Sequence, residues 1–288
     1  MIFAKRCLLP LIASAVIACP AVAAPGLWEV RDDDSAIWLF GSFHVLPENT
    51  EWRTELFDRL LAAADKVVFE TDVSPAAMAA VGAEAFTRGI YVDGTLLTDV
   101  ITAEAEARLR EETSTYGLQV GPLLAMRPWM AANAISVAAM ATSGYTEQGV
   151  EFQLQPELAI EKLVFLETGA EQIEVLAGAP EDEQVALLVS TLDQLDILPK
   201  MMSKMIRNWS GGTPERLAQM FLMEMGGFEE AFLDRLLYAR NRNWISPLQG
   251  MLERNEENMV VVGAAHLIGQ DSVLDLLEQA GYEVERIQ

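Results

Sequence analysis

The chain contains two histidines, and each lies three residues after a glycine. The first is His44, after Gly41, and the second is His266, after Gly263. Each glycine follows a short run of apolar residues typical of a strand. Histidine binds metal ions and transfers protons near neutral pH. Open α/β sheets place their ligands at such strand ends, so the two motifs predict one shared site. The alternative is that each histidine is a hydrogen-bonded polar residue at a strand end.

A third apolar strand ends in a carboxylate. Residues 66–71 predict a strand, and its apolar residues before Glu70 do not alternate with polar ones, which is typical of a strand covered on both faces. Residues 50–64 predict an intervening helix with Thr50 as its cap. Strand, helix and strand form a βαβ unit with parallel strands, so His44 and Glu70 are expected on one edge of the sheet. The alternative for Glu70 is an ordinary solvent-exposed acid.

The two ends of the chain predict the rest of the sheet. Residues 27–40 predict a hairpin that leads into the first histidine motif. After His266, a helix over 271–280 and a strand over 283–287 repeat the βαβ arrangement. We therefore expect an α/β (α+β) protein, with a mixed sheet that has a parallel centre and βαβ units at both ends of the chain.

A largely helical segment, about 74–258, is predicted between these two sheet-forming ends. Its predicted helices include 102–116, 122–140, 181–197 and 214–225, and glycine pairs at 211–212 and 226–227 are expected to end helices. Residues 162–168 predict a further strand that ends in Glu-Thr, as the strand at Glu70 does.

Four residues of this segment are candidates for supporting the site. Glu151 and Glu167 are candidate carboxylates around it, with helix-cap or surface roles as the alternative. Arg240 and Asn241 belong to a basic and amide cluster, for which a solvated helix surface is the alternative. A guanidinium beside carboxylates can hold a substrate carboxylate or stabilise an oxyanion by paired hydrogen bonds.

The N-terminus predicts export. Residues 1–23 combine two basic residues, an apolar run and an Ala-Val-Ala cleavage site, so we expect a signal peptide and a mature domain over 24–288. A lipoprotein anchored through Cys19 is the alternative. Both cysteines, Cys7 and Cys19, lie in the signal, so a mature chain without them contains no disulfide. We expect a periplasmic or secreted protein without a stable membrane span after signal removal.

The net charge of the chain limits the classes of partner that it can bind. The full chain has a formal net charge of −23 at pH 7. Such a surface repels nucleic acid and anionic lipid. We therefore expect a peptide or small-molecule substrate and no nucleic acid.

Together these motifs resemble the TraB/PrgY/GumN family, and most closely its GumN-like bacterial branch. The resemblance extends over the whole expected mature chain and rests on the Trp28 hairpin, both Gly-x-x-His motifs, the Glu70 strand, Leu166 to Thr168, Arg240 with Asn241 and Trp244, and the Gly281-Tyr282 ending. It implies kinship with the Tiki metalloproteases, whose paired Gly-x-x-His motifs and a Glu are proposed to bind a divalent metal. A more distant kinship links the chain to erythromycin-esterase-like hydrolases. Glu151 is a departure, because the family often has Asp there.

These observations favour a metal-dependent hydrolase, most simply a peptidase. His44, Glu70 and His266 would hold Mn, Co or Zn and leave positions open for water. Arg240 and Asn241 would contact the substrate, with Glu151 and Glu167 nearby. One alternative is a metal-free, esterase-like hydrolase in which Glu70 orients His44 as the general base. Another is a protein that binds and sequesters peptides without cleaving them, as PrgY-like relatives are thought to do.

Overall fold

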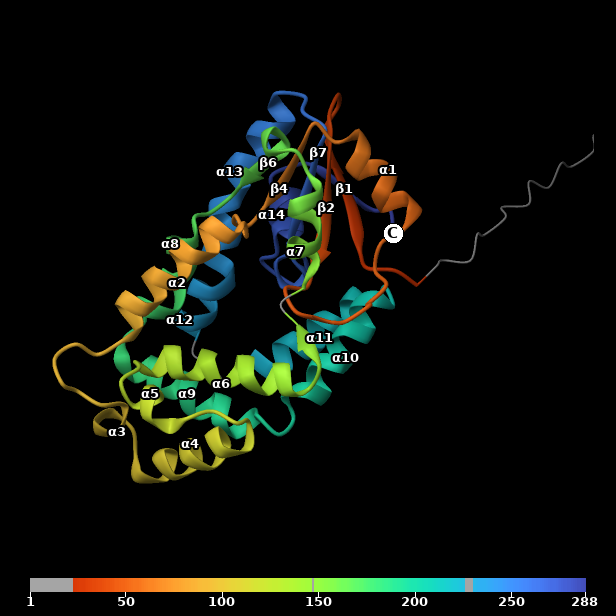
Figure 1. Ribbon diagram of the computed structural model, residues 1–288. Helices are drawn as coiled ribbons and strands as arrows, with labels where there is room; N and C mark the ends of the chain where they lie inside the picture. Colours follow the sequence, from red (N-terminus) through yellow and green to blue (C-terminus); the bar gives the residue numbers. More distant parts are fainter. Residues whose placement is uncertain (1–22, 147, 226–229) are drawn as a thin grey trace, which may run out of the picture.

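A six-stranded mixed sheet forms the centre of the computed structural model, which describes residues 23–146, 148–225 and 230–288 (Figure 1). Its strand order is β6-β4-β7-β2-β1-β8. The strands are β1 (Leu27–Arg31), β2 (Ala36–Ser42), β4 (Lys66–Phe69), β6 (Leu163–Phe165), β7 (Asn258–Gly263) and β8 (Glu283–Arg286). β7 pairs parallel with β2 and β4, β4 pairs parallel with β6, and β1 pairs antiparallel with β2 and β8. The predicted mixed sheet with a parallel centre is confirmed.

The predicted βαβ units are present at both ends of the chain, but their strands are not neighbours. β7 lies between β2 and β4, and both β2 and β1 lie between β7 and β8. The first unit crosses over through α1 (Glu55–Ala63) and the second through α14 (Val273–Gln279). As a result, the N-terminal and C-terminal segments interleave in one sheet.

Helices cover both faces of this sheet, which explains the apolar strands without alternation. Trp38 and Phe40 of β2 pack into one core, with α1, α7 (Val150–Leu154), α10 (Leu198–Ser210) and α11 (Pro214–Met225). Ile37 and Leu39 point to the other face and pack against α13 (Ala239–Glu253) and α14. Both sets of side chains are removed from water, so each strand is stabilised from two sides.

The middle segment adds a helical lobe with its own core. This lobe contains α3 (Leu97–Val100), α4 (Ala103–Thr115), α5 (Val120–Leu124), α6 (Pro128–Thr142) and α9 (Glu181–Gln194). Figure 1 shows it below the sheet, with α2 (Pro75–Gly89), α8 (Gly169–Ala177) and α12 (Glu230–Leu233) along one side. The remaining elements are the strand pair β3 (Leu46–Pro47) and β5 (Tyr145–Thr146), three 3-10 turns (Gln155–Glu157, Ile160–Lys162 and Ala264–Leu267) and a π-helical turn (Asp234–Tyr238).

The helix predicted over 122–140 is divided into α5 and α6, because Pro128 suits the first turn of a helix but not its interior. Two further predicted boundaries were wrong because of side-chain hydrogen bonds. Helix α1 is capped by Thr54, whose side chain accepts from the Phe57 N–H, whereas the Thr50 hydroxyl donates to the Pro47 carbonyl in a preceding turn. The strand expected over 162–168 ends at Phe165. Thr168 instead caps α8 in a reciprocal pair with Glu171. A threonine that the sequence pattern assigns to the end of a strand can thus be the cap of the helix that follows.

Parts of the predicted export signal and helix stops cannot be compared with the fold. Residues 1–22 of the signal and the glycine pair 226–227 lie outside the described residues. Among the residues that are described, no helix is both long and apolar enough to cross a membrane.

Candidate functional site

The strand ends bring the three predicted ligands around Gly263. In the parallel register Ser42 lies opposite Gly263 and Phe69 opposite Val261, so all three strands end at the same edge. A Cβ atom placed on Gly263 would lie 3.1 Å from Glu70 Oε1 and 3.5 Å from His44 Nε2. It would also lie 3.6 Å from His266 Cδ2. Glycine is therefore needed here, because a side chain would enter the space between the three groups.

Glu70 is buried and fully hydrogen-bonded. Oε1 accepts from the Gly263 N–H at 2.6 Å, and Oε2 accepts from Arg240 Nη2 at 2.6 Å and from Gln172 Nε2 at 3.2 Å. Burial opposes its ionisation, but the two histidines, Arg240 and the Gly263 N–H together lower the pKa of Glu70 to about 2. Glu70 is thus an anion over the whole physiological range.

His266 is buried and neutral. Its Nδ1 lies 2.5 Å from Asn241 Oδ1, while Asn241 Nδ2 donates to the Asp271 carbonyl at 2.8 Å. That second bond fixes the amide orientation, so Nδ1 carries the proton and Nε2 keeps its lone pair. Burial is the main cause that lowers the pKa of His266 to about 3, and the charge of Arg240 adds to it. Nε2 faces Glu70 Oε1 at 3.7 Å.

Arg240 connects these groups to Glu167. Its Nε and Nη2 each donate to Glu167 at 2.9 Å, and Nη2 also donates to Glu70. Nη1 donates to the Leu236 carbonyl at 3.1 Å and to His266 Nε2 at 3.2 Å. All five guanidinium N–H groups are therefore used within the protein. Trp244 completes the cluster, since its Nε1 donates to Glu167 at 2.9 Å and its ring centroid lies 4.3 Å from that of His266.

His44 lies in a different environment, beside Glu151. Its side chain is 60% exposed, and its Nδ1 lies 3.2 Å from Oε2 of the buried Glu151. The Ser42 hydroxyl donates to the other oxygen, Oε1. The charge of Glu151 is the main cause that raises the pKa of His44 to about 9. The expected metal-free arrangement, with Glu70 orienting His44, is wrong in this structure, because Glu70 is held by Gly263 and Arg240 while Glu151 contacts Nδ1.

The start of α7 explains how Glu151 reaches His44. Gly149 packs against the backbone of His44 so closely that a Cβ atom would collide with the His44 carbonyl group. The next residue, Val150, donates its N–H to the Phe43 carbonyl at 3.0 Å. Because Gly149 has no side chain, its backbone contacts that of His44 closely, and this contact places Glu151 beside the imidazole.

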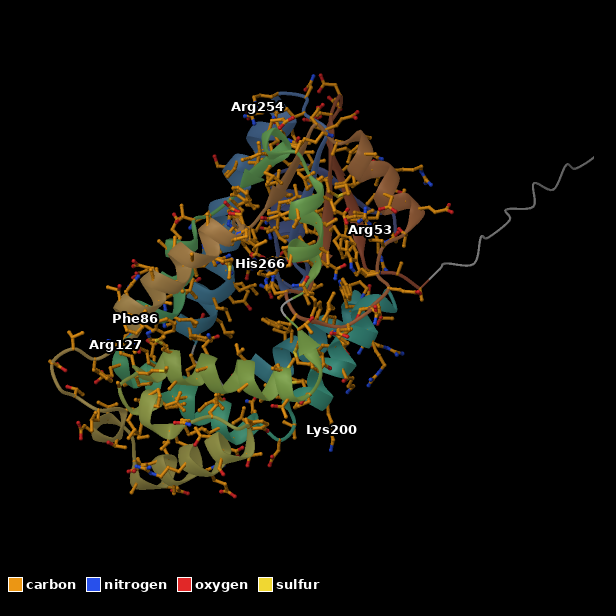
Figure 2. All side chains as sticks on the ribbon, in the orientation of Figure 1. Arg53, Phe86, Arg127, Lys200, Arg254 and His266 are labelled. Carbon is orange, nitrogen blue, oxygen red and sulfur yellow. The ribbon has the colours of Figure 1, made fainter. Side chains whose placement is uncertain are left out.

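A cavity of about 290 Å³ opens beside these groups. His44, Gly263 and His266 line one side of it, together with Arg240, and apolar residues of the helices line the other. Figure 2 shows the labelled His266 at the end of the sheet that faces the helices. The site is therefore a partly enclosed space with its polar groups on one wall.

Asn241 takes a different place from that expected of a substrate contact, whereas Glu167 lies beside the site as a supporting carboxylate. Asn241 is fully buried, and both ends of its amide are used by His266 and Asp271. Glu167 is engaged by Arg240 and Trp244. Sequence reasoning did not single out Gln172 or the Ser42 hydroxyl. Ser42 lies inside the first histidine motif, where its position offered a signal, whereas nothing in the sequence pointed to Gln172.

The chemical types of the three donor groups suit a divalent metal, but the spacing of these groups does not. Two imidazoles and an ionised carboxylate suit Mn, Co or Zn, and a histidine whose Nδ1–H is held by an amide oxygen is typical of metal ligands. Among the described residues, however, no three His, Cys, Asp or Glu side chains form a metal-binding group. Arg240 Nη1 contacts His266 Nε2, the nitrogen with the free lone pair. A metal would have to replace that contact.

Comparison with known proteins agrees with the family resemblance. Two curated relatives match parts of the chain: a metalloprotease TIKI homolog of Amphimedon queenslandica, 29% identical over 66 residues, and metalloprotease TIKI2 of Danio rerio, 42% identical over 52 residues. These matches cover 22% and 17% of this chain but 13% and 10% of the relatives. No solved structure matches. The TraB/PrgY/gumN family matches residues 26–286, and the chain belongs to this family.

Proposed function

We propose that the protein is an exported, metal-dependent hydrolase that cleaves peptides. The observation that carries this proposal is the convergence of His44, Glu70 and His266 around Gly263, at the wall of a cavity. The family membership and the similarity to two metalloproteases support the same reaction class.

The protein prepares two of its three proposed ligands for a metal. Glu70 is already ionised, and His266 is already neutral with Nε2 facing Glu70. His44 presents Nε2 toward Gly263 and Nδ1 toward Glu151, but its raised pKa means that Nε2 must release a proton before it can bind a metal. When bound, a divalent Mn, Co or Zn ion would polarise a carbonyl group and lower the pKa of water.

Arg240 has two roles in this proposal. Its contacts with Glu70 and Glu167 hold both carboxylates in place, and its charge helps to lower the pKa of Glu70. Its Nη1 faces His266 Nε2 and lines the cavity, so this nitrogen becomes free to stabilise an oxyanion or a substrate carboxylate once Nε2 takes another partner. Asn241 supports metal binding indirectly, because it holds the His266 ring in place.

A second candidate needs no metal. His44 and Glu151 form an imidazole-carboxylate pair at 3.2 Å, and His44 is exposed to the cavity. Once His44 has lost its proton, which its pKa of about 9 places in the alkaline range, such a pair can act as a general base toward water, with the carboxylate orienting the ring. In this candidate His266 and Glu70 have structural roles.

Metal analysis and peptide cleavage distinguish these candidates. The protein is purified without added metal, its metal content is measured, and a peptide library is incubated with and without chelator. We expect bound metal and cleavage that chelator abolishes and Mn, Co or Zn restores. Cleavage that resists chelator would support the His44–Glu151 pair instead. Tight peptide binding without turnover would support the sequestering alternative.

Export has its own test. We propose that residues 1–23 are removed and that the mature domain, 24–288, acts in the periplasm or outside the cell. N-terminal sequencing of the protein from its native host should begin near Ala24. A lipid attached to Cys19 would show the lipoprotein alternative, and a chain that retains Met1 would contradict export.

A further inference from the structure

The cavity has an extensive apolar wall beside its polar groups. This wall includes Met202, Met205, Leu217, Phe221, Leu236 and Leu237. Leu217 and Leu237 are buried, but the other four remain partly exposed although they are large and apolar. Partly exposed apolar side chains next to the reacting groups form a binding surface for an apolar group rather than a filled core.

Met202 and Met205 share one face of α10 with core residues. Ile206 and Trp209 follow on the same face and are buried in the core beside the sheet. The two methionines precede this buried pair, reach past the sheet edge and contact the cavity. Because methionine is unbranched and flexible, such a wall adapts to apolar groups of different shape.

The position of α10 is fixed at both ends. Near its C-terminal end, Trp209 Nε1 donates to the Gly41 carbonyl at 2.6 Å, in the strand that leads to His44. Near its N-terminal end, the Pro199 carbonyl accepts from the Tyr145 hydroxyl at 3.2 Å, and the Ser203 hydroxyl, farther along the helix, is hydrogen-bonded to the same group at 2.7 Å. The apolar wall is therefore held at a constant place relative to the first histidine motif.

A second cavity, of about 500 Å³, continues from the first. The two share Phe221, Leu237 and Ile268, and the second is also lined by Glu230 and Asp271. Among the described residues lining either cavity, Arg240 is the only arginine or lysine, and its N–H groups are engaged. In the second cavity, an acidic group on a ligand would thus meet the carboxylates of Glu230 and Asp271 without an arginine or lysine beside them.

We propose that the two cavities bind an extended polypeptide segment, with a large flexible or aromatic side chain such as Leu, Met or Phe in the first cavity. The neighbouring side chain in the second cavity is neutral or basic. Cleavage of this segment rests on the proposed function, whereas its binding does not.

The cleavage test uses unstructured fluorogenic decapeptides that differ at one position, occupied by Leu, Phe, Ala, Lys or Glu. We expect the Leu and Phe peptides to have the highest kcat/KM and the Glu peptide the lowest. The variant M202A/M205A should lower kcat/KM for the Leu peptide about tenfold while changing that of the Ala peptide little. The matched control is Met223→Ala on α11, where the side chain is 79% exposed and lines neither cavity, and it should behave as wild type.

A binding test separates this inference from the proposed reaction. The same peptides, fluorescently labelled, are titrated into metal-free protein and followed by anisotropy. A preference for Leu and Phe that M202A/M205A removes supports the inference even if no peptide is cleaved, in which case the proposed reaction fails. Cleavage without any apolar preference overturns the inference and leaves the reaction intact. Equal binding of the Leu peptide by wild type and M202A/M205A also overturns it.

Discussion

The two Gly-x-x-His motifs have the same local sequence pattern but opposite environments. His266 has a side chain 6% exposed and a pKa lowered to about 3, whereas His44 is 60% exposed and its pKa is raised to about 9. Burial and Arg240 keep the His266 ring neutral, whereas Glu151 favours the charged form of His44. The difference shows that the partners brought by the rest of the chain, rather than the motif, set the chemistry of each histidine.

The largest effect is expected for Glu70, because it is a buried anion that accepts hydrogen bonds from Gly263, Arg240 and Gln172. Glu70→Gln removes a buried charge that Arg240 contacts at 2.6 Å, which should lower the free energy of unfolding by about 3 kcal/mol and abolish metal uptake. Urea unfolding and metal analysis provide the measurements. Glu161→Gln on the exposed surface is the matched control and should change neither quantity. Normal metal content in Glu70→Gln would exclude Glu70 as a ligand.

Substitutions of the two histidines should differ in their effect on the stability of the protein but not in their effect on its activity. His266→Ala removes the contacts of its ring with Asn241 and Trp244 and should cost about 2 kcal/mol, whereas His44→Ala removes a solvent-screened contact with Glu151 and should cost about 1 kcal/mol. Both variants should lose metal and turnover, and the double variant should lose little more activity than either one. Full activity in either single variant would show that its motif is structural.

The protonation states can be read directly, since the chain has two histidines. In an NMR titration of metal-free protein, one imidazole should titrate near pH 9 and the other should stay neutral to about pH 3. The unfolded pKa of histidine is about 6.5. His44, with its raised pKa, stabilises the fold below pH 6.5 and loses this contribution as pH rises to about 9. His266, with its lowered pKa, reduces stability as pH falls from about 6.5 to 3. If both histidines titrated near pH 6.5, the proposed difference between their environments would be contradicted.

The smallest effect concerns the environment of His44 alone. Glu151→Gln removes the charge 3.2 Å from Nδ1 and should lower the pKa of His44 toward its ordinary value, while the pKa of His266 stays unchanged. Ser42→Ala retains the carboxylate charge and should move the pKa of His44 less. The same NMR titration measures both variants. An unchanged pKa of His44 in Glu151→Gln would show that another group causes its shift.

The sequence predicted the parts of the site that lie at strand ends. Apolar runs followed by a glycine or a glutamate placed His44, Glu70 and His266 at one sheet edge, because parallel strands end together. That these residues act in catalysis remains a prediction. The contact between His44 and Glu151 could not be predicted, since it depends on Gly149 packing against a backbone more than a hundred residues earlier in the chain.

The partners of Arg240 show the same limit. The sequence indicated a guanidinium near acids, but not that Glu70 and Glu167 would share it while Leu236 and His266 take its remaining N–H groups. These contacts join segments from four regions of the chain, and no local pattern encodes such pairing. Helix boundaries failed for a related reason, because Thr50 and Thr54 are equally good caps until their other hydrogen bonds are known.

The position of β7 between β2 and β4 determines when the site can form. The Gly263 N–H and Glu70, which it binds, are 193 residues apart in sequence. During synthesis from the N-terminus, β2 and β4 have no common neighbour until residues 258–263 emerge, so the sheet centre cannot close early. An unfinished chain carries His44 and Glu70 but lacks His266 and Arg240. In the exported hydrolase that we propose, late closure would delay the assembly of the reactive groups until nearly the whole polypeptide has been made.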